Sequence, residues 1–270
     1  MTYTTLDVQL ADKVATITLN RPERANAMEQ AMWDEIPLAM QWADATSEVR
    51  CVIIKGAGKH FTAGLDLGLL AGLAVQVADD DEGRSHEKLR RLILKMQEVL
   101  TSIEKCRKPV LAAVHGACVG GGIDLITACD MRYCSADARF SVKEIDNGLT
   151  ADVGTLQRLP KLIGEGMARE MAYTGRFVGA AEAKEIQLVN RVFESVEALH
   201  IGVLELALNI ASKSPLAIRG SKEMITYTRD HSVADGLNYV ATWNAAMLMS
   251  KDLFEAGRAT VEKRPAQFAD

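Results

Sequence analysis

The chain has 270 residues, of which 48% are hydrophobic, enough for one large core or a core with a smaller helical lobe. Its formal net charge of −5 argues against a nucleic-acid partner attracted by bulk charge. No run of eighteen apolar residues occurs, so we expect no membrane-spanning helix.

The two ends and the cysteines carry no special signal. Met1–Asp7 has neither the basic nor the apolar stretch of a secretion signal, and the last residues are no peroxisomal address. We therefore expect a cytoplasmic location, with the mature form of an organellar protein as the alternative. The five cysteines form no Cys-x-x-Cys pair, so we expect reduced core residues and no metal site.

Strands and helices alternate in the first part of the chain. Residues 14–19 alternate β-branched and small side chains as a strand does, and Pro22 ends that strand. Apolar positions at helical spacing predict a helix over 29–45, and a short strand follows at 51–54. This order favours an α/β core.

The middle of the chain continues the alternation. The acidic segment 78–85 predicts an exposed loop, and the amphipathic run 89–100 predicts a helix. A strand at 110–114 leads into three glycines, 120–122, and then into a helix through Ala128. Two further short strands are predicted at 131–134 and 139–142.

Beyond about Leu199 the chain looks helical throughout. Ser214–Pro215 marks a helix start, and Tyr239 and Trp243 recur at helical spacing. We therefore divide the chain into a core with the candidate active site, residues 1–198, and a helical C-terminal region, residues 199–270. An apolar helical tail of this kind covers a core or a neighbouring subunit.

A weak internal repeat relates two parts of the predicted core. It pairs Val52 with Val110, Gly64 with Gly122, and Asp66 with Asp124. Each copy predicts a strand, a glycine turn and a helix start. If the two copies stack, the N–H groups near Leu65 and Gly121 can converge on one carbonyl oxygen as an oxyanion hole. Chance similarity is the alternative.

Three carboxylates, Asp124, Glu144 and Asp152, follow the glycine turn in one stretch of the chain. Glycines before a helix leave free N–H groups that stabilise negative charge, and carboxyl groups transfer protons. Together they predict acid/base chemistry on a carbon acid. In the alternative reading, Asp124 caps or charge-complements the first turn of its helix, and the other two are solvated loop acids.

Several motifs in the same order resemble the crotonase, or enoyl-CoA hydratase/isomerase, superfamily. They are Leu19–Glu23, Phe61–Asp66, Gly120–Gly122, Ala128–Asp130 and Gln157–Pro160. The resemblance implies an α/β crotonase-like spiral of ββα repeats with a helical C-terminal region used in trimerisation. It also implies an acyl-CoA thioester substrate, no cofactor beyond that CoA, and a homotrimer or homohexamer.

Within this superfamily, the chain is most similar to the Δ3,5-Δ2,4-dienoyl-CoA isomerases. The matching segments are 122–126, 142–146, 148–158 and 229–233. Hydratases of the superfamily typically carry glutamates at the positions of Asp124 and Glu144 and commonly glycine at Asp152, so a hydratase fits less well. The resemblance implies conversion of 3,5-dienoyl-CoA to 2,4-dienoyl-CoA in unsaturated fatty acid β-oxidation.

The three acids then have separate predicted roles. We expect Asp152 to remove a proton from C2 and Glu144 to protonate C6. Asp124 would raise the proton affinity of Glu144 by like-charge coupling. The resemblance assigns the oxyanion-hole N–H groups to Leu65 and Gly121.

The candidate substrate and CoA contacts are Arg21, Ala63, Asp66 and Lys263. The two basic residues suit CoA phosphates, with an ordinary surface salt bridge as the alternative for each. Asp66 also suits a role in ordering its own turn. His115 is better interpreted as a satisfied buried or interfacial histidine than as a ligand contact.

Two other functions stay open. In a 2-enoyl-CoA hydratase, Asp124 and Glu144 would orient the attacking water. A catalytically weak oligomeric protein that binds acyl-CoA or another macromolecule could use the same scaffold. Residues 67–77 are expected to line the acyl-tail pocket, but their packing cannot be read from the sequence.

Overall fold

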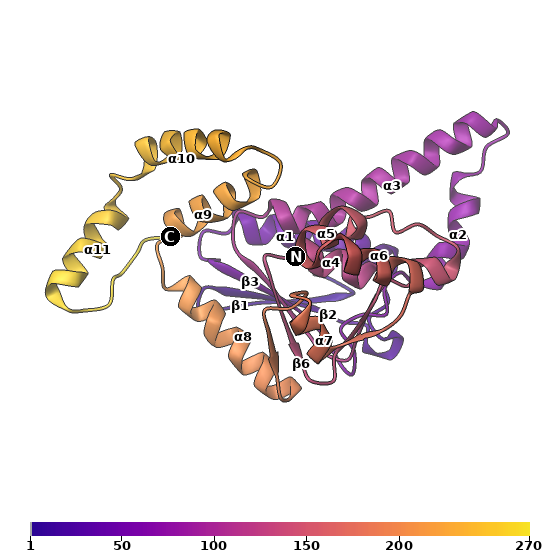
Figure 1. Cartoon of the computed structure of the whole chain (residues 1–270), viewed down its shortest axis with the longest axis horizontal. Helices are drawn as coiled ribbons and strands as arrows, with labels where there is room; N and C mark the ends of the chain where they lie inside the picture. The colour runs from indigo at the N-terminus through magenta and orange to yellow at the C-terminus, as the bar shows by residue number, and fades with distance from the viewer. Residues whose placement is uncertain (1) are drawn as a thin grey trace.

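The computed structural model describes residues 2–270, apart from the side chains of residues 73 and 74. Its larger sheet has the strand order β1-β2-β3-β4-β6-β9 (Figure 1). The first pair is antiparallel, and all later pairs are parallel. The strands are β1 (Leu6–Ala11), β2 (Val14–Leu19), β3 (Cys51–Gly56), β4 (Val110–Val114), β6 (Met131–Ser135) and β9 (Arg191–Phe193).

A smaller sheet continues from the end of the larger one. It has the order β5-β7-β8, with a parallel first pair and an antiparallel second pair. Its strands are β5 (Ala117–Val119), β7 (Arg139–Ser141) and β8 (Val178–Gly179). An isolated parallel bridge between Thr62 and Cys118 joins the turn after β3 to this sheet.

The register of β3 and β4 matches the internal repeat of the sequence. Val52 lies opposite Val110 in this parallel pair. Because carboxyl ends of neighbouring parallel strands meet at one sheet edge, the glycine turns after β3 and β4 lie side by side. The stacking predicted from the repeat is therefore confirmed.

Helices cover both faces of the larger sheet. On one face, α1 (Gln30–Ala45), α3 (Glu82–Lys105) and α4 (Gly121–Ala128) contribute to the main hydrophobic core. On the other face, α8 (Val196–Ala211) buries Leu199, Val203 and Ala207, which recur every four residues, against the strands. The sheet is thus buried on both sides, as expected for an α/β core.

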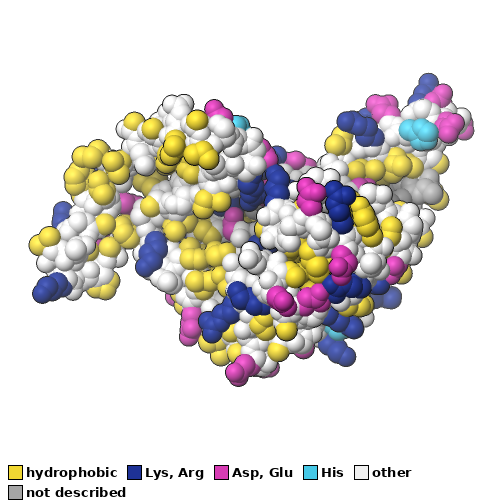
Figure 2. Space-filling model, in the orientation of Figure 1, with side chains coloured by type: hydrophobic (Ala, Val, Ile, Leu, Met, Phe, Trp, Pro, Cys, Tyr) yellow, Lys and Arg dark blue, Asp and Glu magenta, His cyan; other side chains and the backbone are white. Residues whose placement is uncertain are grey.

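The C-terminal helices extend to one side of the sheet core (Figure 1). They are α9 (Pro215–Tyr227), α10 (Val233–Met247) and α11 (Lys251–Glu262). α10 has no buried residue, and yellow patches cover this part of the surface in Figure 2. Exposed apolar side chains of this region include Ile225, Val233, Leu237, Met247, Leu248, Met249, Leu253, Phe254 and Val261.

The helical C-terminal region predicted from the sequence is confirmed. The division at residue 198 stays a prediction and falls in the first turn of α8. The end of the chain returns to the core, where Asp270 Oδ1 lies 2.5 Å from Nε of the buried Arg50. This ion pair fixes the C-terminal tail against the sheet core.

The predicted strands agree with the structure to within two residues, but the loop at 78–85 is wrong in its second half. There α3 already begins at Glu82, because Asp81 Oδ1 accepts a 2.9 Å hydrogen bond from Arg84 N–H as an N-cap. Several elements were not predicted: the strands β1, β5, β8 and β9, and the helices η1 (Pro22–Arg24), α2 (Leu67–Val77), η2 (Glu144–Asn147), α5 (Thr155–Ile163), α6 (Glu165–Thr174) and α7 (Ala180–Glu185).

The remaining expectations concern cysteines, membranes and metals. All five cysteines are free and buried, as predicted. Within residues 2–270, no single helix is both long and apolar enough to cross a membrane, and α8 with α9 passes that test only as a pair bent by 107°. No group of three or more metal-ligating side chains occurs among the described residues.

Candidate active site

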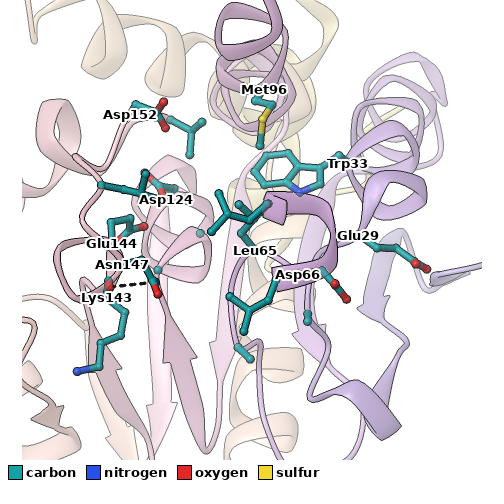
Figure 3. Close-up of a pocket in the computed structure, with 18 of the residues that line it drawn as sticks. Glu29, Trp33, Leu65, Asp66, Met96, Asp124, Lys143, Glu144, Asn147 and Asp152 are labelled. Atoms are coloured by element: carbon teal, nitrogen blue, oxygen red, sulfur yellow. Dashed lines mark hydrogen bonds between the residues drawn. The ribbon is translucent and has the colours of Figure 1, made fainter. Parts of the chain in front are cut away.

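A cavity of about 990 Å³ lies between the stacked glycine turns and helices α1, α2 and α3. Figure 3 shows Asp152, Asp124 and Glu144 along one side of it, facing Leu65, Trp33 and Met96. Of the nine predicted site residues, only Lys263 lies outside its lining. The other eight are Arg21, Ala63, Leu65, Asp66, Gly121, Asp124, Glu144 and Asp152.

Asp124 is fully buried in the first turn of α4. Its Oδ1 accepts a 2.6 Å hydrogen bond from the backbone N–H of Thr155. Burial raises the pKa of Asp124 to about 6, although the hydrogen bond from Thr155 opposes this shift. The carboxylate accepts a hydrogen bond from α5 and makes no capping bond to α4, so capping is wrong, whereas its place in the first turn agrees with the charge-complement alternative.

Glu144 begins the short helix η2 and lies over the glycine turn. A Cβ added to Gly120 would come within 3.3 Å of Glu144 Oε1, and Gly120 has φ +53. Burial, with the negative charge of Asp124 as a second cause, raises the pKa of Glu144 to about 7. Near neutral pH, this carboxyl group can therefore hold a proton.

Asp152 is the most exposed of the three acids. Its backbone carbonyl accepts a 2.7 Å hydrogen bond from Nε2 of Gln97 on α3. Partial burial raises the pKa of Asp152 above its usual range. The side chain lines the same cavity as Asp124 and Glu144, but it retains contact with solvent.

Three buried oxygens at this wall lack hydrogen-bond partners among the described residues. They are Asp124 Oδ2, Glu144 Oε2 and Thr155 Oγ1. Buried polar atoms are normally paired, because an unpaired one costs about 1–3 kcal/mol. The unpaired carboxylate oxygens of Asp124 and Glu144 are thus free to bond a substrate, a proton or a water molecule.

Two backbone N–H groups face the same cavity. Leu65 N–H has no acceptor among residues 2–270, and Gly121 N–H is the first of α4, where no intrahelical acceptor exists. A Cβ on Gly121 would lie 3.7 Å from Leu65 N, which shows how closely the turns approach. This pair has the chemistry of an oxyanion hole.

The approach of the two turns depends on Gly64. This residue has φ +87, and an added Cβ would come within 3.2 Å of Gly121 N and 2.5 Å of Val119 O. Any side chain there would push apart the segments that carry the two N–H groups.

An apolar wall faces the carboxylates. The buried Trp33 on α1 is fixed by a 3.0 Å hydrogen bond from Nε1 to the Met28 carbonyl oxygen. The other apolar side chains of the wall come from α2 and α3 and include Leu67, Leu70, Leu89, Leu92, Ile93 and Met96. This surface suits a hydrocarbon chain.

Arg21 and Asp66 lie at the polar side of the cavity. Arg21 lies 3.2 Å from carboxylate oxygens of both Glu29 and Asp66, so its charge is already balanced. Asp66 also caps α2 by accepting a 2.9 Å hydrogen bond from Gly68 N–H, as the turn-ordering interpretation predicted. Lys263 lies on the C-terminal side of α11, away from the cavity lining of its own chain.

His115 is buried, as predicted, but only half satisfied. Its Nε2 lies 2.9 Å from the Gly58 carbonyl oxygen, and its Nδ1 has no partner in the described structure. The ring packs edge-on against His200 of α8 with a centroid distance of 5.9 Å. His115 is not part of the cavity lining.

Several residues at the site were missed from the sequence. Gln97 and Thr155 support the cavity through contacts between elements far apart in the chain, and Trp33 supports it through a local hydrogen bond to Met28. Only the helical spacing of the apolar α3 residues gave a signal, and it did not show which side faces the cavity.

Residues 9–270 match the family described as enoyl-CoA hydratase/isomerase, and the chain belongs to this family. It is 48% identical to the peroxisomal Δ(3,5)-Δ(2,4)-dienoyl-CoA isomerase of Arabidopsis thaliana, over 99% of this chain and 98% of that protein. It is also 48% identical to the mitochondrial enzyme of the same name from Homo sapiens, over 97% of this chain and 80% of that protein.

Hydratases of the family are less similar. The crotonyl-CoA hydratase of Syntrophomonas wolfei is 34% identical over 99% of each chain. The crystal structure of an enoyl-CoA hydratase from Bacillus anthracis superposes with a TM-score of 0.89 at 32% identity, covering 98% of this chain and 99% of that one. The crotonase fold expected from the sequence is thereby confirmed.

Proposed function

We propose that the chain is a Δ3,5-Δ2,4-dienoyl-CoA isomerase. The observation that carries the proposal is the third carboxylate, Asp152, on the cavity wall that also bears Asp124 and Glu144. Moving two conjugated double bonds requires removal of a proton from C2 and addition of one at C6, so a base at one end and an acid at the other suffice. Relatives that share about half of their residues with this chain carry the name of this activity.

The proposed reaction starts with ionised Asp152, which takes a proton from C2 of the 3,5-dienoyl thioester. The electron pair of the C2–H bond delocalises through C1 onto the thioester oxygen and through the two double bonds onto C4 and C6. The N–H groups of Leu65 and Gly121 stabilise that oxygen, and loss of one such donor commonly costs about 3 kcal/mol. Protonation at C6 by Glu144 then gives the 2,4-dienoyl product.

The charge states that this scheme needs agree with the environments of the acids. The solvent contact of Asp152 favours the ionised form of a base. The raised pKa of Glu144, about 7, favours a protonated acid near neutral pH. Asp124 contributes to that shift through its negative charge, so we assign it the role of tuning Glu144.

The proposal includes the substrate contacts and the assembly. The apolar wall from α1, α2 and α3 would hold the acyl chain, and Ala63, Asp66 and Arg21 would contact the CoA portion. Lys263 would contact CoA only in an assembly in which it lies near the cavity of another copy of the chain. We propose a homotrimer or homohexamer built through the exposed apolar C-terminal helices.

No cofactor besides the CoA of the substrate enters the proposed reaction. The relatives' names give peroxisomal and mitochondrial locations. They support the organellar alternative over the cytoplasmic expectation. β-Oxidation of unsaturated fatty acids is the process that this activity would serve.

The deciding experiment is an ultraviolet assay of 3,5-octadienoyl-CoA conversion to the conjugated 2,4-dienoyl product. We expect the wild type to isomerise this substrate and Asp152→Asn to lose about 10²–10⁴-fold in kcat. Hydration of 2-enoyl-CoA is measured alongside. Efficient hydration without isomerisation would overturn the proposal. Absence of both activities would also overturn it and would favour a protein that only binds acyl-CoA.

One observation favours a second candidate, a 2-enoyl-CoA hydratase. The unpaired Asp124 Oδ2 and Glu144 Oε2 are two acceptors that could hold an attacking water between them. In that reaction Asp152 has no role, so Asp152→Asn would leave hydration unchanged. The same variant therefore separates the two functions.

A further inference from the structure

Glu104, near the end of α3, lies between two arginines from different parts of the chain. Its Oε2 accepts hydrogen bonds from Arg158 Nη2 at 2.8 Å and Nε at 3.1 Å. Its Oε1 accepts a hydrogen bond from Nη1 of Arg229. The side chains of Glu104 and Arg158 are only 18% and 15% exposed. Solvent therefore screens their ion pair less than it screens a surface pair.

Arg158 lies in the first turns of α5, the helix that orients Asp124. The backbone N–H of Thr155, at the start of this helix, donates the 2.6 Å hydrogen bond to Asp124 Oδ1. The guanidinium of Arg158 also packs against Gly154, where an added Cβ would overlap Nη1. The Glu104–Arg158 pair thus holds the beginning of α5 in place.

The same face of α3 holds the rest of this segment. Gln97 Nε2 donates to the Asp152 carbonyl oxygen at 2.7 Å, and Thr101 Oγ1 accepts from Arg158 Nη2 at 3.2 Å. Gln97, Thr101 and Glu104 follow one another at spacings of four and three residues, which places them on one helix face. This polar face contacts residues 152–158 at both ends.

Arg229 connects this network to the C-terminal helices. It lies in the turn between α9 and α10 and bonds the oxygen of Glu104 that Arg158 does not use. A second ion pair joins the same turn to α5, with Lys161 Nζ 2.7 Å from Asp230 Oδ1, but both of its side chains are more than half exposed. Of these two contacts, only that of Arg229 uses the carboxylate of Glu104, which also bonds the segment that carries Asp152.

We propose that Glu104 is a positioning residue that fixes residues 152–158 through Arg158 and ties that segment to the C-terminal helices through Arg229. It touches no reacting atom. Its effect on turnover rests on the proposed function, because that effect passes through Asp152 and Asp124. Its effect on the mobility of residues 152–158 does not depend on which reaction the site performs.

The test compares the wild type with Glu104→Gln, which keeps the size of the side chain but removes its charge. We expect kcat for 3,5-octadienoyl-CoA to fall about tenfold to a hundredfold with little change in KM, because misplaced catalytic groups lose rate and not substrate contacts. By hydrogen–deuterium exchange, peptides covering residues 152–158 should exchange faster. Glu104→Asp keeps the charge, so its kcat and its exchange in residues 152–158 should lie between those of Glu104→Gln and the wild type.

Two further variants complete the design. Arg229→Gln should accelerate exchange in residues 152–158 and lower kcat, although less than Glu104→Gln does. Asp230→Asn breaks the neighbouring exposed pair and is the matched control, so it should change neither quantity. If Arg229→Gln behaves like Asp230→Asn, the link to the C-terminal helices is wrong.

The outcomes for Glu104→Gln are distinct from those for the reaction itself. Unchanged exchange of residues 152–158, or faster exchange spread evenly over the whole chain, would overturn the positioning role. A wild type without isomerase activity would overturn the proposed function alone, since the exchange measurement would still report on the segment. Circular dichroism melting of each variant identifies a general loss of folding.

Discussion

The backbone N–H of Thr155 donates a 2.6 Å hydrogen bond to Oδ1 of the fully buried Asp124. The other oxygen of that carboxylate has no partner in the described part of the chain. A buried carboxylate with one paired and one unpaired oxygen can interact with a substrate, but it lowers the free energy of unfolding.

Asp124→Asn should stabilise the protein at alkaline pH. The folded pKa of Asp124, about 6, lies above the ordinary aspartate pKa of 3.8, so the folded state binds the proton more tightly than the unfolded state. Stability is therefore lost as pH rises through this range, by up to about 3 kcal/mol. Asparagine avoids that loss and still accepts the Thr155 hydrogen bond.

The check is thermal or urea unfolding of both proteins at several pH values. The variant should exceed the wild type at pH 8, and the difference should shrink towards about pH 4, where the aspartic acid is largely protonated in the folded state. An advantage that stays constant over this range would contradict the prediction. Isomerase activity of the variant should fall while its stability rises.

The rate of isomerisation should decline as pH rises through about 7. Glu144 must carry a proton to deliver it to C6, and its raised pKa of about 7 sets that limb of the kcat profile. Asp124→Asn removes the second cause of the shift, so its limb should move to lower pH. A kcat that stays flat up to pH 9 would exclude Glu144 as the acid.

Gly120→Ala should impair both folding and turnover. The alanine would have to adopt φ +53 with ψ −119, a sparsely populated backbone conformation that costs about 1–3 kcal/mol, and its Cβ would come within 3.3 Å of Glu144 Oε1. We expect a lower Tm and a lower kcat. The matched control is Gly166→Ala in α6, where an added Cβ meets nothing within 4 Å. This substitution should stabilise the helix by about 0.5–1 kcal/mol.

Met96→Trp should shorten the space available to an acyl chain. Met96 lines the cavity beside Trp33, so a larger ring there should lower kcat/KM for long-chain substrates by about tenfold more than for short ones. Leu94→Trp serves as control, because Leu94 is 43% exposed and lies outside the cavity lining. Equal losses for all chain lengths in Met96→Trp would indicate a general disturbance of α3.

The sequence was sufficient for the parts of the fold that depend on local pattern. Residues 110–114 and the helix through Ala128 were predicted correctly, because a short continuous apolar run and a glycine turn are local signals. The match of Val52 with Val110 even predicted which strands pair. In contrast, the start of α3 at Glu82 was missed, since the acidic composition of this segment obscured the Asp81 cap.

At the site, the sequence predicted which residues gather but not how they are held. The three acids and the two N–H groups line one cavity as expected. Gln97 and Thr155 hold this wall, but neither has a local signal in the sequence. Gln97 bonds a residue 55 positions away, and Thr155 bonds a residue 31 positions away. Such long-range bonds depend on how the elements pack, which one sequence does not encode in any short motif.

Helix α3 combines two surfaces that meet different parts of the cavity. Leu92, Ile93 and Met96 form part of its apolar wall, and Gln97 begins the polar face that contacts residues 152–158. A substitution that rotates or shifts this helix to admit a new acyl chain will therefore also displace Asp152. We expect epistasis between tail-pocket substitutions and substitutions in 152–158. Engineering of chain-length preference will succeed only when both surfaces are varied in the same library.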